Sequence, residues 1–199
     1  MLSKQKQQTA FDALSETFGY KSPMAAPRIQ KIIISAGTGS AKDKKNRGEV
    51  VTDRLAKITG QKPMPRPARI AIASFKTRVG DIVGYQVTLR GARMFDFLDK
   101  LIHIALPRTR DFRGIPISAV DGMGNLTIGI KEHTIFPETS DEDLKDVFGL
   151  AVTIVTTASS KAEAEAFFRH LGIPLRPSSE TDGTPRDRQV DRGGARLIQ

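Results

Sequence analysis

The clearest strand pattern in this chain is TGQKPMPRPARIAIASFKTRVGDIVGYQVTLRGAR, which runs from Thr59 to Arg93. Apolar residues alternate there with polar or basic residues, and a short loop around Gly80 interrupts the alternation. A period of two is typical of a strand that buries one face. The stretch therefore predicts two strands joined by a loop, with a basic exposed face suited to a polyanion.

The two predicted strands differ in character. Pro63, Pro65 and Pro67 precede the first one, and they favour an extended edge segment because proline donates no ladder hydrogen bond. The first strand is then expected at residues 70–75. The second strand separates an apolar face from a polar face: Tyr85, Val87 and Leu89 on one side, and Gln86, Thr88 and Arg90 on the other.

The remaining segments predict helices and further strands. Apolar residues recur at helical spacing in residues 3–18, 46–59, 93–105 and 160–171, and Ser140 is a candidate cap for one more short helix. Strand patterns occur at residues 29–36, 126–131 and 150–156. The helix at 93–105 has the strongest apolar stripe, so we expect it to pack against the back of the sheet.

The charge balance favours a nucleic-acid partner. The chain has 31 Lys and Arg against 22 Asp and Glu, which gives a net charge of +9 and a pI near 10.0. Its 199 residues suffice for one hydrophobic core, so one domain is expected at 1–175, followed by a polar tail at 176–199. Without cysteine or an apolar run of about 20 residues, we expect a cytoplasmic location away from membranes.

Motifs for catalysis are few. Gly37–Lys42 resembles the opening of a phosphate-binding loop, but it lacks the remaining glycine of either nucleotide-binding motif. A nucleotide-binding enzyme is kept as an alternative on this motif alone. The three histidines, His103, His133 and His170, fall in separate predicted elements, so their spacing indicates no dyad and no metal site. We therefore expect no enzymatic activity, no metal and no cofactor.

The chain has few aromatic side chains that could stack on bases. This narrows the class of nucleic acid expected as its partner. The chain has no Trp, and its tyrosines are Tyr20 and Tyr85. It also lacks the G-x-x-G loop of KH domains. A protein of this kind is expected to bind a folded RNA through its shape and phosphates rather than to bind unpaired bases singly. A general basic RNA chaperone is the second alternative.

Successive blocks of the sequence carry a family resemblance. In order, they are PRIQKIIISAGTGSAK, ITGQKPMPRPAR, IASFKTRVGDIVGYQVTLRGARMFDFLDKLIHIALPRTRDFRG, DGMGNLTIGIKEHTIFPE, and the final VTTA with LGIP. These blocks resemble the bacterial large-subunit ribosomal protein five family, which binds 5S rRNA. They cover about residues 2–174, and the tail lies outside the family pattern.

The resemblance implies an α+β fold, with a mostly antiparallel, curved sheet of about five strands and helices packed on one face. It implies a ribosome-bound, non-enzymatic protein of the central protuberance. Its implied partners are 5S rRNA, 23S rRNA, P-site tRNA, a small-subunit head protein and other central-protuberance proteins. Carried over residue by residue, the contacts of the sheet with rRNA fall on Ser35, Gln61 and Thr88. The cations expected at the rRNA are Arg28, Lys31, Lys62, Arg66, Arg69, Arg90 and Arg93.

The resemblance assigns two further contact regions. The loop expected to reach P-site tRNA contains Phe75, Lys76, Thr77, Arg78, Gly80 and Gly84. The region expected to bridge to the small subunit contains Arg110, Arg113, Asp121, Gly122, Met123 and Asn125.

Three places depart from the family pattern. Ser35 stands where the family has Asn, so one hydroxyl replaces an acceptor and two donors. A contact there is expected to be shorter or bridged by water. Ile70 and Ala71 stand where the family has Lys and Ser, which removes a charge and a hydroxyl. Met123 replaces an Arg, which weakens phosphate binding at that turn.

Overall fold

A computed structural model describes residues 1–39, 44–75, 77–110, 112–139 and 147–176. The predicted cap at Ser140, the loop residue Lys76 and most of the polar tail lie outside the described residues. So do Ser40 to Lys42 of the candidate phosphate-binding loop.

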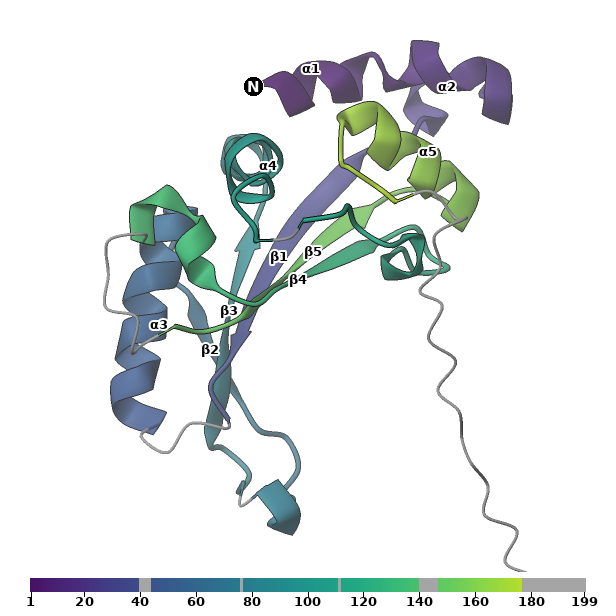
Figure 1. The fold of residues 1–199 in the computed structure, drawn as a ribbon. Coiled ribbons are helices and arrows are strands. Elements are labelled where there is room, and N and C mark those ends of the chain that lie inside the picture. The colour runs from purple at the N-terminus through teal and green to yellow at the C-terminus, as the bar shows by residue number, and fades with distance from the viewer. Residues whose placement is uncertain (40–43, 76, 111, 140–146, 177–199) are drawn as a thin grey trace, which may run out of the picture.

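The described strands form one open, curved sheet (Figure 1). They are β1 (Ile29–Gly37), β2 (Met64–Pro67), β3 (Ile82–Leu89), β4 (Leu126–Ile130) and β5 (Leu150–Thr156). Their order is β2-β3-β1-β5-β4, and all neighbouring strands are antiparallel. The expected α+β fold with an antiparallel sheet is confirmed, and β1 is its central strand.

The helices lie on one side of this sheet (Figure 1). They are α1 (Leu2–Gln8), α2 (Ala10–Phe18), α3 (Lys44–Thr59), α4 (Ala92–Lys100) and α5 (Lys161–Leu171). The helix expected at residues 93–105 is α4 followed by a π-helical segment, Leu101–Ala105. The opposite face of the sheet carries no helix in the described part of the chain.

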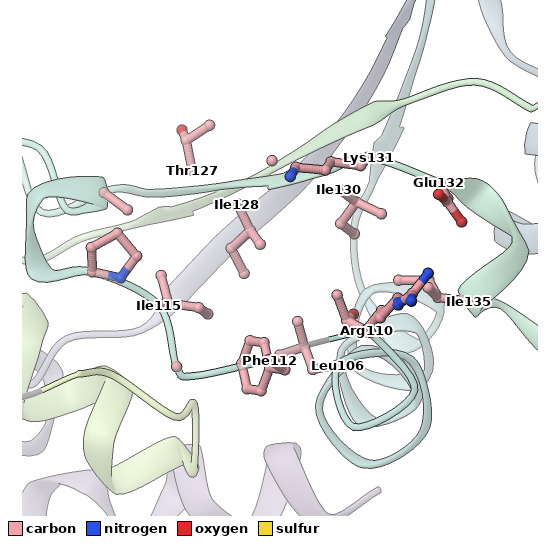
Figure 2. A pocket seen from close by; sticks show the side chains of 15 residues that line it. Leu106, Arg110, Phe112, Ile115, Thr127, Ile128, Ile130, Lys131, Glu132 and Ile135 are labelled. Atoms are coloured by element: carbon pink, nitrogen blue, oxygen red, sulfur yellow. The ribbon is translucent and has the colours of Figure 1, made fainter. Parts of the chain in front are cut away.

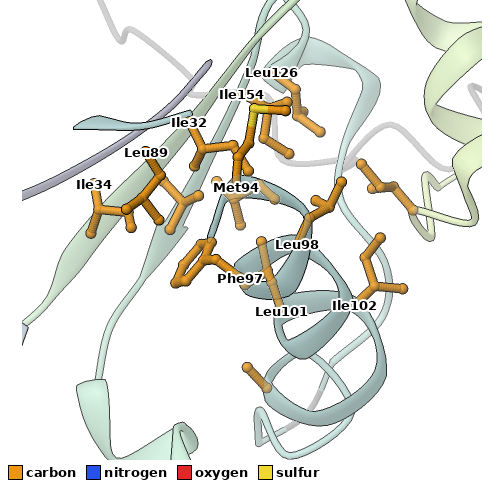
Figure 3. Packing of buried hydrophobic residues seen from close by; sticks show 14 of the residues in the cluster. Ile32, Ile34, Leu89, Met94, Phe97, Leu98, Leu101, Ile102, Leu126 and Ile154 are labelled. Carbon is orange, nitrogen blue, oxygen red and sulfur yellow. The ribbon is translucent and has the colours of Figure 1, made fainter. Parts of the chain in front are cut away.

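The part of the core drawn in Figure 3 lies between the sheet and α4 with its π-helical extension. Buried residues of α2, α3 and α5 belong to the same core. From the strands, Ile32 and Leu89 are fully buried, and Leu98 and Leu101 meet them from the helical side. Full burial of one such side chain contributes about 1.5–3 kcal/mol. The amphipathic stripe of 93–105 therefore does hold the helical layer on the back of the sheet.

Hydrogen bonds around Glu163 join α2 to α5. Ser160 caps α5 by accepting a hydrogen bond from the backbone N–H of Glu163. The Glu163 carboxylate accepts from the N–H of Ser159 and from the Tyr20 hydroxyl, which connects the end of α2 to the start of α5. Burial, together with the hydrogen bond to Glu163 and its charge, raises the pKa of Tyr20.

The helix predicted over residues 3–18 is divided at Thr9, so that prediction was wrong in its continuity. Thr9 has ψ of −1°, and its hydroxyl donates to the carbonyl of Lys6. A threonine that bonds to the preceding turn competes with the regular helical ladder. Both α1 and α2 contact α5.

The strand predicted at residues 70–75 does not form. Ile72 makes a single bridge to Thr77, and a 3₁₀ turn covers Ala73–Phe75. Ile70 is 72% exposed, because the segment extends beyond the helical layer and has no surface to cover. Alternation without a partner surface does not make a strand stable. The preceding prolines do form the predicted edge strand, β2.

Candidate RNA interface

The uncovered face of the sheet contains no carboxylate. None of the described strands includes Asp or Glu, although the chain has 22 of these residues. Strand register places the following residues on that face: Lys31, Ile33, Ser35 and Gly37 of β1, Met64 and Arg66 of β2, Gly84, Gln86 and Thr88 of β3, Thr127 and Gly129 of β4, and Ala151, Thr153 and Val155 of β5. This uncovered face thus combines hydroxyl, amide and small side chains with a few cations and three larger apolar side chains, Ile33, Met64 and Val155.

Ser35 lies near the centre of this face. Its Cα partners are Gln86 on β3 and Ala151 on β5. Gln86 accepts a hydrogen bond of 2.5 Å from Nε of Arg66, which holds the guanidinium against Gln86. Gln86 on β3 thus lies between two predicted residues, Ser35 on β1 and Arg66 on β2. Gln86 was not among the predicted contacts, although its alternation with Tyr85 and Val87 placed it on the polar face.

Gln61 and Thr88 also come together. The amide of Gln61 donates to the backbone carbonyl of Thr88 over 3.4 Å, and the N–H of Gln61 bonds to the Thr59 hydroxyl. Both predicted residues are half-buried. They sit 27 residues apart in sequence, and the fold places them at one edge of the polar face.

A shallow depression that few side chains fill lies beside Ser35. It has a volume of about 560 Å³, and Gly37, Gly129 and Gly149 are among its lining residues. A Cβ added to Gly37 or to Gly129 would meet no atom within 4 Å, so nothing covers these peptide groups. Lys131 borders the same depression. An RNA backbone can approach the peptide plane closely here.

Two threonines extend the polar face toward β4, and sequence reasoning missed them. The hydroxyls of Thr127 and Thr153 are 3.1 Å apart and share a hydrogen bond. Both strands alternate apolar and small polar residues, which was the available signal. It became informative only once β4 and β5 were known to be neighbours.

The cations predicted to contact rRNA do not all lie on the same side of the molecule. Arg28, Lys62, Arg69 and Arg90 are exposed, close to strand ends or to the connections between them. Arg93 instead lines a hollow between α3 and α4, together with Lys57 and Asp96. Arg93 therefore belongs to the helical side, and its predicted role at the rRNA has no support from its position.

The loop between β2 and β3 carries a cluster of exposed apolar side chains. Phe75 is 71% exposed and Val79 is 68% exposed. At the base of the loop, Ala68 donates its N–H to the carbonyl of Asp81 and accepts from the N–H of Gly80. The Asp81 carboxylate also accepts from the N–H of Arg78. Gly80 turns the chain with φ of +93°. The predicted Thr77 and Arg78 lie in this loop.

Gly84 does not belong to that loop. It is buried within β3, and a Cβ there would lie 2.7 Å from the carbonyl oxygen of Ala36. Its lack of a side chain allows β1 and β3 to approach each other. A packing role therefore explains this glycine better than contact with a ligand.

The turn before β4 is rigid and carries an apolar tip. Asp121 accepts from the N–H groups of Met123 and Asn125, and the Asn125 side chain donates to its other oxygen. The hydrogen bonds from Asn125, side chain first, hold the pKa of Asp121 below its usual value. Met123 is 75% exposed. The predicted residues Asp121 to Asn125 thus form one ordered projection, whereas Arg110 and Arg113 are exposed on a separate segment.

The histidines show no common site. His103 is exposed on the π-helical segment, and His170 contacts the carbonyl of Lys6. His133 is fully buried and stacks on Phe148, with ring centroids 4.3 Å apart. The described residues contain no cluster of three His, Asp or Glu that could hold a metal. None of the helices in the described part is long and apolar enough to cross a membrane.

Comparison with known proteins identifies the family. Residues 22–78 match the family model described as "Ribosomal protein L5", and residues 82–175 match the model for the C-terminus of the same ribosomal family. The chain is 46% identical over 177 residues to the "Large ribosomal subunit protein uL5" of Rubrobacter xylanophilus, covering 89% of this chain and 98% of that protein. It is also 46% identical to the proteins of the same name from Anaeromyxobacter sp. (strain K) and Streptococcus pyogenes, covering 82% of this chain and 91% of each. The chain therefore belongs to the uL5 family of large-subunit ribosomal proteins, which are RNA-binding structural components of the translating ribosome and not enzymes.

Proposed function

We propose that the uncovered face of the sheet binds 5S rRNA, with neighbouring 23S rRNA at its margin, in the central protuberance of the cytoplasmic ribosome. The observation that carries this proposal is the absence of carboxylates from all described strands, in a face that gathers Ser35, Gln86, Thr88 and Gln61. Hydroxyl and amide groups can pair with ribose 2′-hydroxyls and base edges in a shallow minor groove.

Shape and a small number of cations determine how this face would bind. Lys31, Arg66 and Lys131 supply positive charge on or beside the strands, and the bare depression at Gly37 and Gly129 permits close approach. Each phosphate neutralised changes the slope of log affinity against log salt by about −0.7 to −0.9. Three such contacts predict a slope of about −2 to −3 for the sheet alone, with exposed arginines at its margin adding to it.

We assign the loop between β2 and β3 to P-site tRNA. Phe75 offers an exposed ring for stacking on a base, and Arg78 offers a cation on the same loop. Deleting the side chain of Phe75 should weaken binding of tRNA to assembled ribosomes, with 5S rRNA binding unchanged. Equal loss of both activities would contradict the assignment.

We assign the projection at Asp121 to Asn125, with Arg110 and Arg113, to a protein of the small-subunit head. Its rigid turn and the exposed Met123 suit contact with a protein surface. The Met that replaces the family's Arg makes this contact less dependent on salt. Other proteins of the central protuberance are expected at the helical side.

The decisive experiment is a competition between two RNAs. The chain is titrated with labelled 5S rRNA in the presence of unlabelled 5S rRNA or an unrelated folded RNA of similar length. We expect preference for 5S rRNA, and a loss of about 1–2 kcal/mol in affinity for Gln61→Ala and for Thr88→Ala, because each leaves a buried polar partner unpaired. Arg93→Ala is the matched control, since that residue lies on the helical side. Equal competition by both RNAs would favour a general RNA chaperone.

A further inference from the structure

A slot runs along the outer edge of β4, on the helical side of the sheet (Figure 2). Ile128 and Ile130 point into it from β4, and Leu106, Phe112 and Ile115 line it from the opposite side. Its volume is about 420 Å³, within the range of about 300–1,000 Å³ typical of ligand pockets. The slot is thus a largely apolar space of useful size on the helical side of β4.

The strand that borders the slot has an open edge. In the described sheet, β4 pairs with β5 alone. On its other edge Val120 makes a single bridge to Leu126, and no described strand pairs with the rest of β4 there. Unpaired peptide groups on an edge strand are a template for an added strand. Side chains of an added strand would alternate between the slot and the uncovered face, because successive residues of a strand point to opposite sides.

The charged residues around the slot indicate which kind of polypeptide segment would bind there. Arg110 and Lys131 line it. Glu132 is the one acidic residue among the described residues that line the slot. This excess of positive charge favours an acidic partner.

We propose that the slot binds an extended, acidic segment of another protein, which adds as a strand to the free edge of β4. Its apolar side chains would alternate with acidic ones. The apolar set fills the space between Ile130 and Phe112, and the acidic set lies beside Lys131, with Arg110 at one end of the slot. An RNA fits these features poorly, since it offers no peptide ladder to β4 and no apolar side chains to the slot.

This surface shares Lys131 with the proposed RNA face and Arg110 with the proposed small-subunit contact. Its test therefore contains neither RNA nor ribosomes, and its failure would leave the proposed function standing. The probe is a fluorescent peptide of about ten residues that alternates Val and Glu, a length typical of an added strand. Two further peptides are compared with it: one with the same composition in two blocks, and one with Lys in place of Glu.

Fluorescence anisotropy with the full chain should show the alternating acidic peptide binding at least about tenfold more tightly than either comparison peptide. Arg110→Glu should weaken it by about tenfold. Arg108→Glu is the matched control, because it adds the same charge change on the same segment without lining the slot. Equal binding of the block peptide, or an equal loss in both variants, would overturn the proposal.

Hydrogen exchange tests the strand addition itself. The bound peptide should slow the exchange of backbone amides in residues 126–131, because new inter-strand hydrogen bonds would protect them. Protection confined to other segments would overturn the proposal even if the peptide binds.

Discussion

The two faces of the sheet are formed by alternate residues of the same strands, and the two sets of side chains differ in chemistry. On β3, Leu89 and Val87 are almost fully buried under the helical layer, whereas Thr88 and Gln86 lie on the uncovered face. The covered face holds the protein together through apolar contact. The uncovered face adds little to the core and keeps its polar groups available. Neighbouring residues can therefore be substituted to separate stability from RNA binding.

The largest expected difference between the faces concerns stability. Leu89→Ala should lower the free energy of unfolding by about 2–5 kcal/mol, because it removes a fully buried side chain and leaves a cavity. Thr88→Ala, one residue away, should change it by less than about 1 kcal/mol. Chemical denaturation measures both values. Similar losses for the two variants would show that the faces are not independent.

The next effect concerns charge on the uncovered face. Ser35→Glu should reduce 5S rRNA affinity by at least about tenfold, since it places a carboxylate against phosphates in a face that has none. Its unfolding free energy should change by no more than about 0.5 kcal/mol. Ala162→Glu, which adds the same charge to an exposed position of α5, is the control. An unchanged affinity for Ser35→Glu would remove Ser35 from the interface.

Part of the loss of folding stability at low pH should come from the helical side. Asp99 accepts hydrogen bonds there from the N–H and the hydroxyl of Ser3. Burial acts to raise the pKa of Asp99, but these bonds outweigh it, so that the pKa lies below its ordinary value of 3.8. The stabilisation is therefore complete above that value and is lost as the pH falls through the folded-state pKa.

Asp99→Asn should accordingly show a smaller loss of stability between about pH 5 and pH 2 than the unchanged chain. Asp96→Asn, an exposed position on the same helix, is the matched control. Thermal unfolding across this pH range measures the effect. Parallel pH profiles for Asp99→Asn and the unchanged chain would show that this carboxylate does not contribute.

The smallest expected effect is a gain in affinity for 5S rRNA. Ser35→Asn restores the residue expected from the family pattern, and its amide adds two donors beside Gln86. One additional hydrogen bond to RNA predicts an increase in affinity of about fivefold, or about 1 kcal/mol. A filter-binding titration against 5S rRNA measures it. A decrease would mean that the local surface has adapted to serine.

Much of the architecture could be predicted from local patterns. The alternation in residues 85–90 assigned both faces of β3 correctly, and the spacing in 93–105 identified the helix that covers the core. The left-handed glycines Gly19 and Gly172 end α2 and α5, close to the predicted helix ends at residues 18 and 171. These features depend on residues within a few positions of one another, which is why the sequence shows them directly.

Other features depended on partners that are distant in the chain. The alternation at 70–75 gave no strand, because no surface is present to cover it. Regular alternation in the strand predicted at residues 29–36 would put Ile29 on the same face as Lys31. An irregularity in the β1–β5 register instead turns Ile29 into the core, where it is 5% exposed. The pairing of Thr127 with Thr153 required knowledge of which strands are neighbours.

The sequence by itself determined the strand and helix periods, the caps, the net charge and the exclusion of Asp and Glu from the predicted strands. Only the tertiary structure decided the order β2-β3-β1-β5-β4, and with it the meeting of Gln61 with Thr88 and of Ser35 with Gln86. It also decided that β4 is an edge strand beside an apolar slot. The physical reason is that periods and caps arise from local backbone geometry, whereas strand order depends on how the whole chain buries its apolar surface.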